Sequence, residues 1–270
     1  MTSRPQAALG QWTKAPLALV VAQVRLNSFT DLASIAVPFG ERIGKDYPRI
    51  QPMQQLISAF PGAEGPTPEH PNVTLVGHSY SNAENTKSVR LELGAITYAV
   101  SAYAQYAGHF EEEWRALVEA ASSVKELFIT RIGLRYVDFI LPKAGAVPED
   151  YVATPLGRAP NLAQGKATVA FNLFNYEMPE GSMRVQFGRS EGRPDLPPDL
   201  VGLQLAPSPV MVREFTAEAA AILDIDRSMQ PELSLPADEI MSRFATMHND
   251  MSKAFKRIIT ERAKKDWGAK

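Results

Sequence analysis

The spacing of hydrophobic residues changes several times along the chain, and each spacing predicts a different kind of element. Before residue 105, short β-branched or alternating runs are typical of strands, and they occur at 17–27, 50–60, 73–81, 88–94 and 95–101. Gly94 separates the last two runs, which predicts a β-hairpin. Between the runs, 31–45 is expected to be a helix or a turn, and 61–72 is expected to be a loop because it holds four prolines and two glycines.

The middle of the chain changes to a helical period and then returns to a strand pattern. Four apolar residues recur every three or four positions, at Phe110, Trp114, Leu117 and Ala121. Glutamates occupy the first turns of this segment, where the helix dipole favours negative charge. An amphipathic helix is therefore predicted over 107–123. The next apolar run, 126–141, is the longest predicted strand, and we expect a β-bulge at Gly133.

The second half follows a similar order. After a loop at 142–166, strand patterns occur at 166–178, 182–189, 201–207 and 219–228. An apolar stripe then runs from Ile240 to Ile258 in steps of three and four residues, which predicts one amphipathic helix over about 236–264. This order lacks regular βα alternation, so the sequence predicts an α+β fold with a mainly antiparallel sheet.

The domain organisation follows from the length and from the order of these elements. The 270 residues are expected to form a single domain, 1–270. The segments 15–142 and 166–264 each place a hairpin before a helix, and they are compatible with two similar halves. No residue-level repeat connects them.

Composition narrows the classes of function. Lys and Arg number 28 against 30 Asp and Glu, which gives a net charge of −2, and 45% of the residues are hydrophobic. This balance argues against a uniformly basic nucleic-acid-coating protein. The chain contains no cysteine, so disulfide scaffolds, thiolate nucleophiles and iron–sulfur ligation are excluded. Without a signal-like or membrane-spanning apolar run, we expect a soluble cytoplasmic protein that makes no membrane contact.

Four stretches of the sequence also carry a family resemblance. They are APLALVVAQVRLN at 15–27, YAQYAGHFEEEW at 103–114, ITRIGLRYVDFI at 129–140, and the pair ILDIDR and MHNDMSKAFKRIITE at 222–261. In this order they resemble a sporadically distributed prokaryotic family of about this length that has no assigned activity. The IGLRY and LDID motifs are the most specific part. The resemblance implies an intracellular prokaryotic protein of an accessory locus, and it supplies no catalytic residues.

Four charged residues on two predicted strands form the candidate binding site. Arg131 and Arg135 share one side of their strand with Gly133 between them, and Asp224 and Asp226 likewise share a side. If the two strands are neighbours, these residues form cross-strand ion pairs, which is the preferred interpretation. The other interpretation is an open groove in which the two arginines hold a phosphate or carboxylate and Gly133 leaves room for the ligand.

Other motifs carry less weight. The segment 77–81, Gly-His-Ser-Tyr-Ser, lacks the second glycine and the following helix of an esterase nucleophile turn, so an ordinary strand end is predicted. The histidines show no metal-binding spacing, and they lie at His70, His78, His109 and His248. His248 is expected on the polar flank of the last helix with a capping or interface role, and His109 at the entry of the first helix.

The C-terminal end of the chain is strongly basic. Residues 253–270 hold seven basic and two acidic residues, so this end carries +5 and the remainder −7. Six of these basic residues form the candidate nucleic-acid surface, namely Lys253, Lys256, Arg257, Arg262, Lys264 and Lys265. The aromatic residues Phe171, Phe174 and Tyr176 could stack on bases, but a half-buried hairpin is the preferred interpretation.

The lack of a catalytic constellation favours a non-enzymatic recognition protein. It would act through a protein partner or through a second copy of itself, as a regulatory or immunity-type component of an accessory locus. Binding would use a sheet edge or a helix face, with Arg131 and Arg135 as polar anchors, and we expect no cofactor, no metal and no catalytic residue. Two alternatives remain open, which are nucleic-acid binding by the basic end and a metal-dependent hydrolase that uses Asp224 and Asp226.

Overall fold

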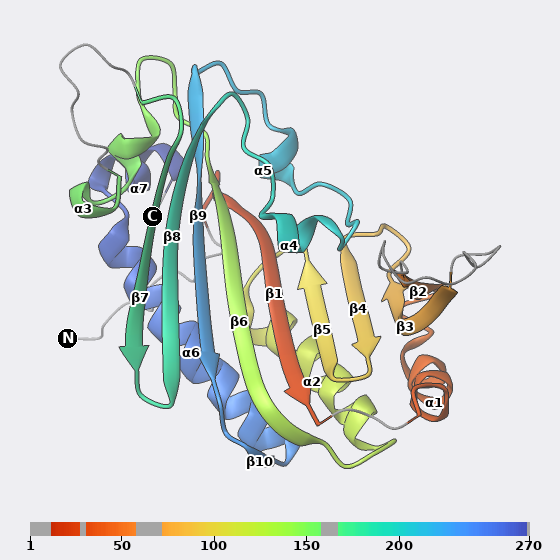
Figure 1. Ribbon diagram of the computed structural model, residues 1–270. Helices are drawn as coiled ribbons and strands as arrows, with labels where there is room; N and C mark the ends of the chain where they lie inside the picture. Colours follow the sequence, from red (N-terminus) through yellow and green to blue (C-terminus); the bar gives the residue numbers. More distant parts are fainter. Residues whose placement is uncertain (1–11, 28–30, 58–71, 158–166, 269–270) are drawn as a thin grey trace, which may run out of the picture.

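The fold is built around one large antiparallel sheet (Figure 1). The computed structural model describes residues 12–27, 31–57, 72–157 and 167–268. Ten strands pair in the order β2-β3-β4-β5-β1-β6-β9-β8-β7, with β10 pairing with β6 beside this path. The prediction of an α+β fold with a mainly antiparallel sheet is confirmed.

The strands are β1 (Leu17–Leu26), β2 (Arg49–Ile57), β3 (Asn72–Ser81), β4 (Lys87–Glu92), β5 (Ala95–Val100), β6 (Phe128–Ile140), β7 (Ala170–Met178), β8 (Gly181–Glu191), β9 (Ala219–Met229) and β10 (Leu233–Ser234). The α-helices are α1 (Ala33–Ile43), α2 (Glu111–Ser122), α3 (Thr154–Gly157), α4 (Pro198–Val201), α5 (Pro209–Val212), α6 (Ala237–Ile258) and α7 (Glu261–Trp267). Two further helical turns are η2 (Tyr106–Phe110) and η3 (Pro148–Tyr151).

Strands β1 and β6 form the centre of the sheet. The strands β2 to β5 lie on the β1 side, and β7 to β9 lie on the β6 side. Strand β6 is the longest described strand, as its long apolar run predicts, with 13 residues. It pairs with β1 along one edge and with β9 along the other, so Arg135 stands opposite both Val21 and Asp226. Residues from both ends of the chain therefore meet on one strand.

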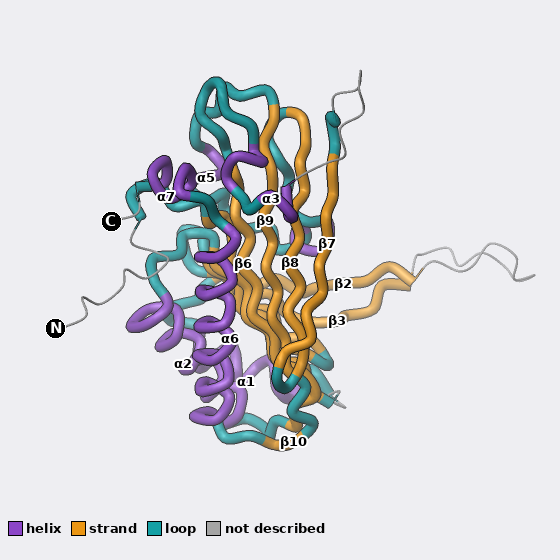
Figure 2. The backbone as a smooth tube through the Cα atoms, turned by 90° about the vertical axis from the view of Figure 1, so that its left-hand side faces the viewer, coloured by secondary structure: helices purple, strands orange, loops and turns teal. Residues whose placement is uncertain are grey.

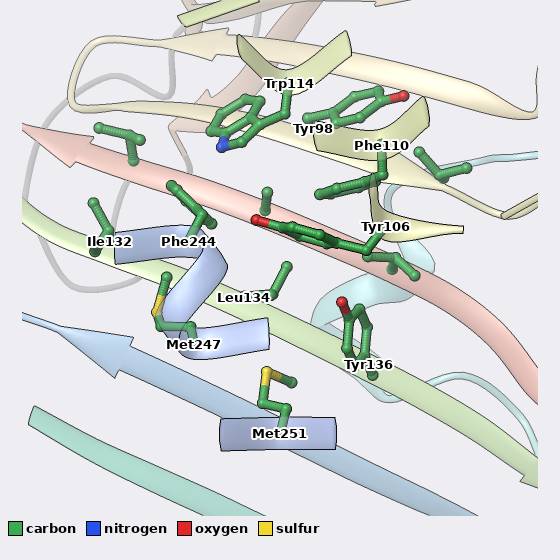
Figure 3. Close-up of a cluster of buried hydrophobic side chains, with 14 of the residues drawn as sticks. Tyr98, Tyr106, Phe110, Trp114, Ile132, Leu134, Tyr136, Phe244, Met247 and Met251 are labelled. Atoms are coloured by element: carbon green, nitrogen blue, oxygen red, sulfur yellow. The ribbon is translucent and has the colours of Figure 1, made fainter. Parts of the chain in front are cut away.

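The main hydrophobic core lies between one face of the sheet and the helices. Figure 2 shows α2 and α6 on this face, while β2 and β3 project to the opposite side. The Trp114 ring of α2 stacks on Tyr98 at 6.0 Å between centroids and meets Phe244 of α6 edge-on at 5.5 Å. Figure 3 shows these rings above the side chains of Leu134 and Tyr136. The apolar faces predicted for the two helices are thus buried against the sheet.

A second, smaller core covers part of the opposite face of the sheet. It is formed by residues 193–213, which we call the cover segment and which contain α4 and α5. Apolar side chains of this segment pack against β1 and β6, through the contacting residues Leu200, Leu203, Val210, Leu19, Val137 and Phe139. The cover segment leaves a polar part of this face uncovered.

The β-bulge expected at Gly133 is wrong. Gly133 pairs in regular register with Gln23 on β1 and with Ser228 on β9. The register shifts of the β1–β6 pair occur instead between Leu17 and Leu19 and at Arg25. A Cβ atom at Gly133 would lie 3.3 Å from a guanidinium nitrogen of Arg131, so this glycine makes room for a neighbouring side chain.

Two further predictions about the second half are corrected. The strand expected at 201–207 is a helical turn and a loop, because Leu200 and Leu203 can both face the sheet at helical spacing but not at strand spacing. The single helix expected over 236–264 is divided at Ile259 and Thr260. The Thr260 amide donates to the carbonyl of Tyr151 at 3.1 Å, so contacts with the η3 segment replace the helical hydrogen bonds there.

Some predictions fall partly outside the described residues. The expected loops at 61–72 and 142–166 include residues 61–71 and 158–166, of which nothing is described. In the described part of the second loop, the chain forms η3 and α3. Within the described ranges, no helix is long and apolar enough to cross a membrane.

Candidate functional site

The open part of the sheet face carries a polar groove of about 450 Å³, which we call the arginine groove. Its lining comes from the strands β1, β4, β5, β6, β8 and β9 and from α4 and Leu203. The charged and polar residues that line it are Gln23, Arg25, Arg90, Glu92, Thr97, Arg131, Arg135, Arg184, Asp199 and Asp226. Arg131 and Arg135 thus share one groove with three further arginines that the sequence analysis did not single out. Those residues lie on strands whose position in the sheet the sequence does not reveal.

Arg135 is held by two carboxylates. Its Nε and Nη2 atoms donate to the two oxygens of Asp224 at 2.8 and 2.7 Å, and its Nη1 atom donates to Asp199 at 2.5 Å. The Asp224 side chain is fully buried and that of Arg135 is 11% exposed. Burial lowers the pKa of Arg135, but the hydrogen bonds to Asp224 and Asp199 more than offset this, so the pKa rises above its ordinary value. Arg135 therefore has the structural pairing that its position beside β9 favours.

Arg131 is bound much more loosely. Its nearest carboxylate oxygen, on Asp226, is 3.8 Å away, and its Nη1 atom is 3.5 Å from the amide oxygen of Gln23. Both acceptors are shared, because Arg184 donates to Asp226 at 3.2 Å and Arg25 donates to Gln23 at 3.0 Å. A short, strong guanidinium hydrogen bond spans about 2.7–2.9 Å, so Arg131 keeps donor capacity. The ion-pair interpretation thus agrees with the contacts of Arg135, and the interpretation as an open groove for an anion agrees with the contacts of Arg131.

The electrostatics of the groove agree with an excess of positive charge around Arg131. Burial lowers the pKa of Arg131, the neighbouring Arg25 and Arg184 lower it further, and Asp226 opposes the change. Burial also raises the pKa of Asp226 in spite of the surrounding arginines. In the described part of the chain, the buried Nε atoms of Arg90 and Arg184 have no hydrogen-bond partner. An added anion would supply the acceptors that this groove lacks.

The two aspartates do not form a shared cation site. Both oxygens of Asp224 accept hydrogen bonds from Arg135, and Asp226 faces Arg131 and Arg184. Among the residues that the structure describes, no group of three or more His, Cys, Asp or Glu residues could hold a metal ion. The structure gives no support to a metal-dependent hydrolase based on this pair.

The residues 77–81 lie in regular strand structure, as predicted. They belong to β3 and pair with β4, and the Ser79 hydroxyl is 3.2 Å from that of Ser88. No sharp turn presents the serine, so the geometry of an esterase nucleophile is not formed at Ser79. His109 lies at the helix entry, where its Nδ1 atom is 3.1 Å from the side-chain nitrogen of Gln105.

His248 does not lie on the polar flank of its helix, and that prediction is corrected. Its ring stacks on Tyr106 with 4.0 Å between centroids, and its Nδ1 atom is 2.7 Å from the Tyr136 hydroxyl. His248 lies four residues after Phe244, so it belongs to the apolar stripe of α6, and this spacing could have revealed its place. Burial, with a smaller contribution from Lys256, lowers the pKa of His248 to about 4.

We expect His248 to remain neutral in the folded protein throughout the physiological pH range. An exposed histidine protonates near pH 6.5, whereas the imidazole of His248 should protonate only near pH 4. The folded-state pKa lies below the unfolded one, so this group lowers stability as the pH falls below about 6.5. NMR titration of the His248 ring protons checks this. A His248 midpoint above pH 6 would contradict the expectation.

The basic residues of the C-terminal end are not equivalent. Arg262 forms ion pairs with Asp150 and Asp266, and Lys264 pairs with Glu261. Within the described ranges, the other four candidate residues form no ion pair, namely Lys253, Lys256, Arg257 and Lys265. Two of these four, Lys253 and Arg257, line a groove beside the edge of the sheet. The basic surface is thus smaller than the sequence suggests.

The outer edge of β7 is the second candidate site, and the sequence analysis did not predict its exposure. No strand of the described chain pairs with this edge. Four of its large apolar side chains are exposed, Phe171 by 59%, Tyr176 by 49%, Leu173 by 46% and Phe174 by 38%. A groove of about 430 Å³ runs beside the strand, which we call the edge groove. It is lined by Tyr176, Met178, Met183 and Val185 of the sheet and by Asp250, Lys253, Ala254, Arg257 and Ile258 of α6.

Comparison with known proteins did not identify a relative of this chain. No family model matches the sequence, and no curated protein is significantly similar to it. Function is therefore inferred from the geometry of these two sites, and the family resemblance stays a prediction.

Proposed function

We propose that the protein is a recognition protein that binds an extended, acidic segment of a protein partner along β7. The observation that carries the proposal is the free edge of β7, which has exposed apolar side chains on both faces and the edge groove on one of them, lined by Tyr176. An extended peptide can add a strand to such an edge through main-chain hydrogen bonds, and pockets for alternate side chains provide specificity.

The other edge of the sheet differs from β7 in a way that supports this choice. Strand β2 contains Pro52, which cannot donate a main-chain hydrogen bond. Proline and charged residues on edge strands are common protection against unwanted pairing. Strand β7 has no proline, and Glu177 is its only charged residue. The chain therefore leaves β7 available for pairing.

The charge beside β7 indicates the chemistry of the partner. Lys253 and Arg257 are exposed residues of α6 that line the edge groove, and among its described lining residues Asp250 alone is acidic. Asp250 is 3.4 Å from the buried Arg227 and is partly neutralised by it. A partner strand with acidic side chains would complement the two exposed cations, while its apolar side chains would pack on Tyr176 and Met183.

Charge reversal in the edge groove tests the proposal. Peptides selected from a random display library on the wild-type protein are expected to alternate apolar and acidic residues. The double variant Lys253→Glu and Arg257→Glu should bind them at least about 10-fold more weakly, since two attractive contacts become repulsive. A bound peptide should also protect the outward-facing amides of β7 from hydrogen exchange.

A matched control separates this effect from net charge. The variant Arg42→Glu and Lys45→Glu changes the charge equally at exposed positions near the end of α1, and it should bind the peptides like the wild type. Peptide binding that left the β7 amides unprotected would contradict the proposal. Protection that rises with protein concentration alone would show that a second copy of the chain covers β7 instead.

A further inference from the structure

We propose that the arginine groove binds a small organic phosphate monoester. Its phosphate would lie between Arg25, Arg131 and Arg184, and its organic part would extend toward Leu200 and Leu203. This site lies on the face of the sheet that carries the cover segment, apart from the edge groove on the α6 side. It is therefore independent of the proposed peptide site.

The arginines of the groove have more hydrogen-bond donors than their neighbouring side chains have acceptors. Arg25, Arg131 and Arg184 each have five N–H donors, but within the described ranges their hydrogen bonds and ion pairs reach two acceptor side chains, Asp226 and Gln23. The distances from Arg131 to these acceptors, 3.8 and 3.5 Å, leave it without a short hydrogen bond. A tetrahedral oxyanion presents several acceptors at once and suits the planar donor fork of arginine.

The charge of the lining matches a doubly negative ligand. Arg135 pairs with both Asp199 and the buried Asp224, so these three groups together carry a net charge of −1. Around the proposed phosphate position, Arg25, Arg131 and Arg184 lie near the one carboxylate of Asp226, which gives a local net charge of +2. A phosphate monoester carries close to two negative charges above its second pKa of about 6. A carboxylate would leave one positive charge uncompensated.

The shape of the groove leaves space for more than the phosphate. Its volume of about 450 Å³ lies within the range of small-molecule sites. One part of its wall is apolar and consists of Val21, Leu200 and Leu203. Gly133 contributes by letting the Arg131 guanidinium lie along the strand, since a Cβ atom there would lie 3.3 Å from it. A ligand with a phosphate at one end and an apolar body at the other fits this lining.

Calorimetric titration with phenyl phosphate and phenyl sulfate at pH 7.5 tests the proposal. The two probes share size and shape but carry about two and one negative charges, so phenyl phosphate should bind at least about 10-fold more tightly. Arg131→Met should weaken phenyl phosphate binding at least about 10-fold. Arg25→Met, at an exposed position, provides a second variant that does not depend on the buried packing of Arg131.

The control is Arg42→Met, which removes an exposed arginine from α1 on the helix side of the sheet and should leave binding unchanged. Absence of binding at millimolar phenyl phosphate would overturn the proposal. Equal affinity in the wild type, Arg131→Met and Arg25→Met would also overturn it, because the ligand would then lie elsewhere. Neither result bears on peptide binding at β7.

Discussion

Replacing Arg135 with methionine is expected to destabilise the fold by about 3–5 kcal/mol, the usual cost of leaving one partner of a buried ion pair uncompensated. The Asp224 side chain is fully buried, and both of its oxygens are bound by Arg135. Methionine fills much of the same volume but leaves this carboxylate without a cation. Urea unfolding followed by circular dichroism measures the change in the free energy of unfolding.

Two matched variants make this expectation specific. Arg131→Met is the same substitution four residues away on β6, and it should cost no more than about 1 kcal/mol because the ion pair of Arg131 is long and partly exposed. The double variant Arg135→Met and Asp224→Leu should recover most of the stability, since it removes both members of the buried pair. A loss below about 1 kcal/mol for Arg135→Met would mean that Asp224 does not depend on this arginine.

The second large effect is expected at Asp138. This residue of β6 is 3% exposed, and it lines a small cavity on the helix side of the sheet with Trp12, Tyr103 and Tyr136. Within the described ranges, no hydrogen bond or ion pair reaches its carboxyl group. Burial, and to a smaller extent the charge of Asp224, raises the pKa of Asp138 to about 8. The carboxyl group is thus protonated at neutral pH in the folded protein.

The raised pKa makes stability depend on pH in a defined direction. Between pH values of about 4 and 8 the unfolded chain has lost this proton while the folded chain keeps it, so the free energy of unfolding falls by up to about 1.4 kcal/mol per pH unit as the pH rises. Asp138→Asn keeps the shape and removes the ionisation. It should therefore be more stable than the wild type at pH 8 and should show a flatter profile.

Urea unfolding at pH values from about 5 to 9 provides the measurement for Asp138. Asp46→Asn, at an exposed position in the turn after α1, is the matched control and should follow the wild-type profile. A profile of Asp138→Asn parallel to that of the wild type would show that another group controls the pH dependence.

The local pattern of hydrophobic and polar residues was sufficient to predict most helices and strands and to predict which residues share a face of a strand. Alternation places Arg131 with Arg135, and Asp224 with Asp226, on one side of their respective strands, and the structure brings the two pairs together on one face of the sheet. The spacing of apolar residues by three and four positions identifies the two helices that cover the core, α2 and α6. These features depend only on residues that are close in sequence, so they can be predicted from a single sequence.

The different roles of the two arginines could not be predicted in the same way. Arg135 is bound by Asp199, which comes from the cover segment, just before the residues 201–207 for which the sequence pattern wrongly predicted a strand. Arg131 is crowded by Arg25 of β1, the strand beside β6, and by Arg184 of β8, one strand further away, and only the order of the sheet brings these residues together. Interactions between segments that are distant in sequence therefore determine that Arg135 is fully paired and that Arg131 is not.

The exposure of β7 has the same origin. Its aromatic residues suit a half-buried hairpin, but the strand lies at the end of the sheet, so Phe171 and Tyr176 are only partly covered. The break of the C-terminal helix at Ile259 likewise depends on η3, more than 100 residues earlier in the chain. The two proposed halves, 15–142 and 166–264, stay a prediction.

The central position of β1 and β6 has a consequence for synthesis on the ribosome. Strands β2 to β5 can pair with one another and with β1 as soon as they emerge. The second edge of β1 has no partner until Phe128–Ile140 has left the exit tunnel. Such distant pairings delay folding. The nascent chain therefore exposes one unpaired edge of an apolar strand for the time needed to translate the intervening residues.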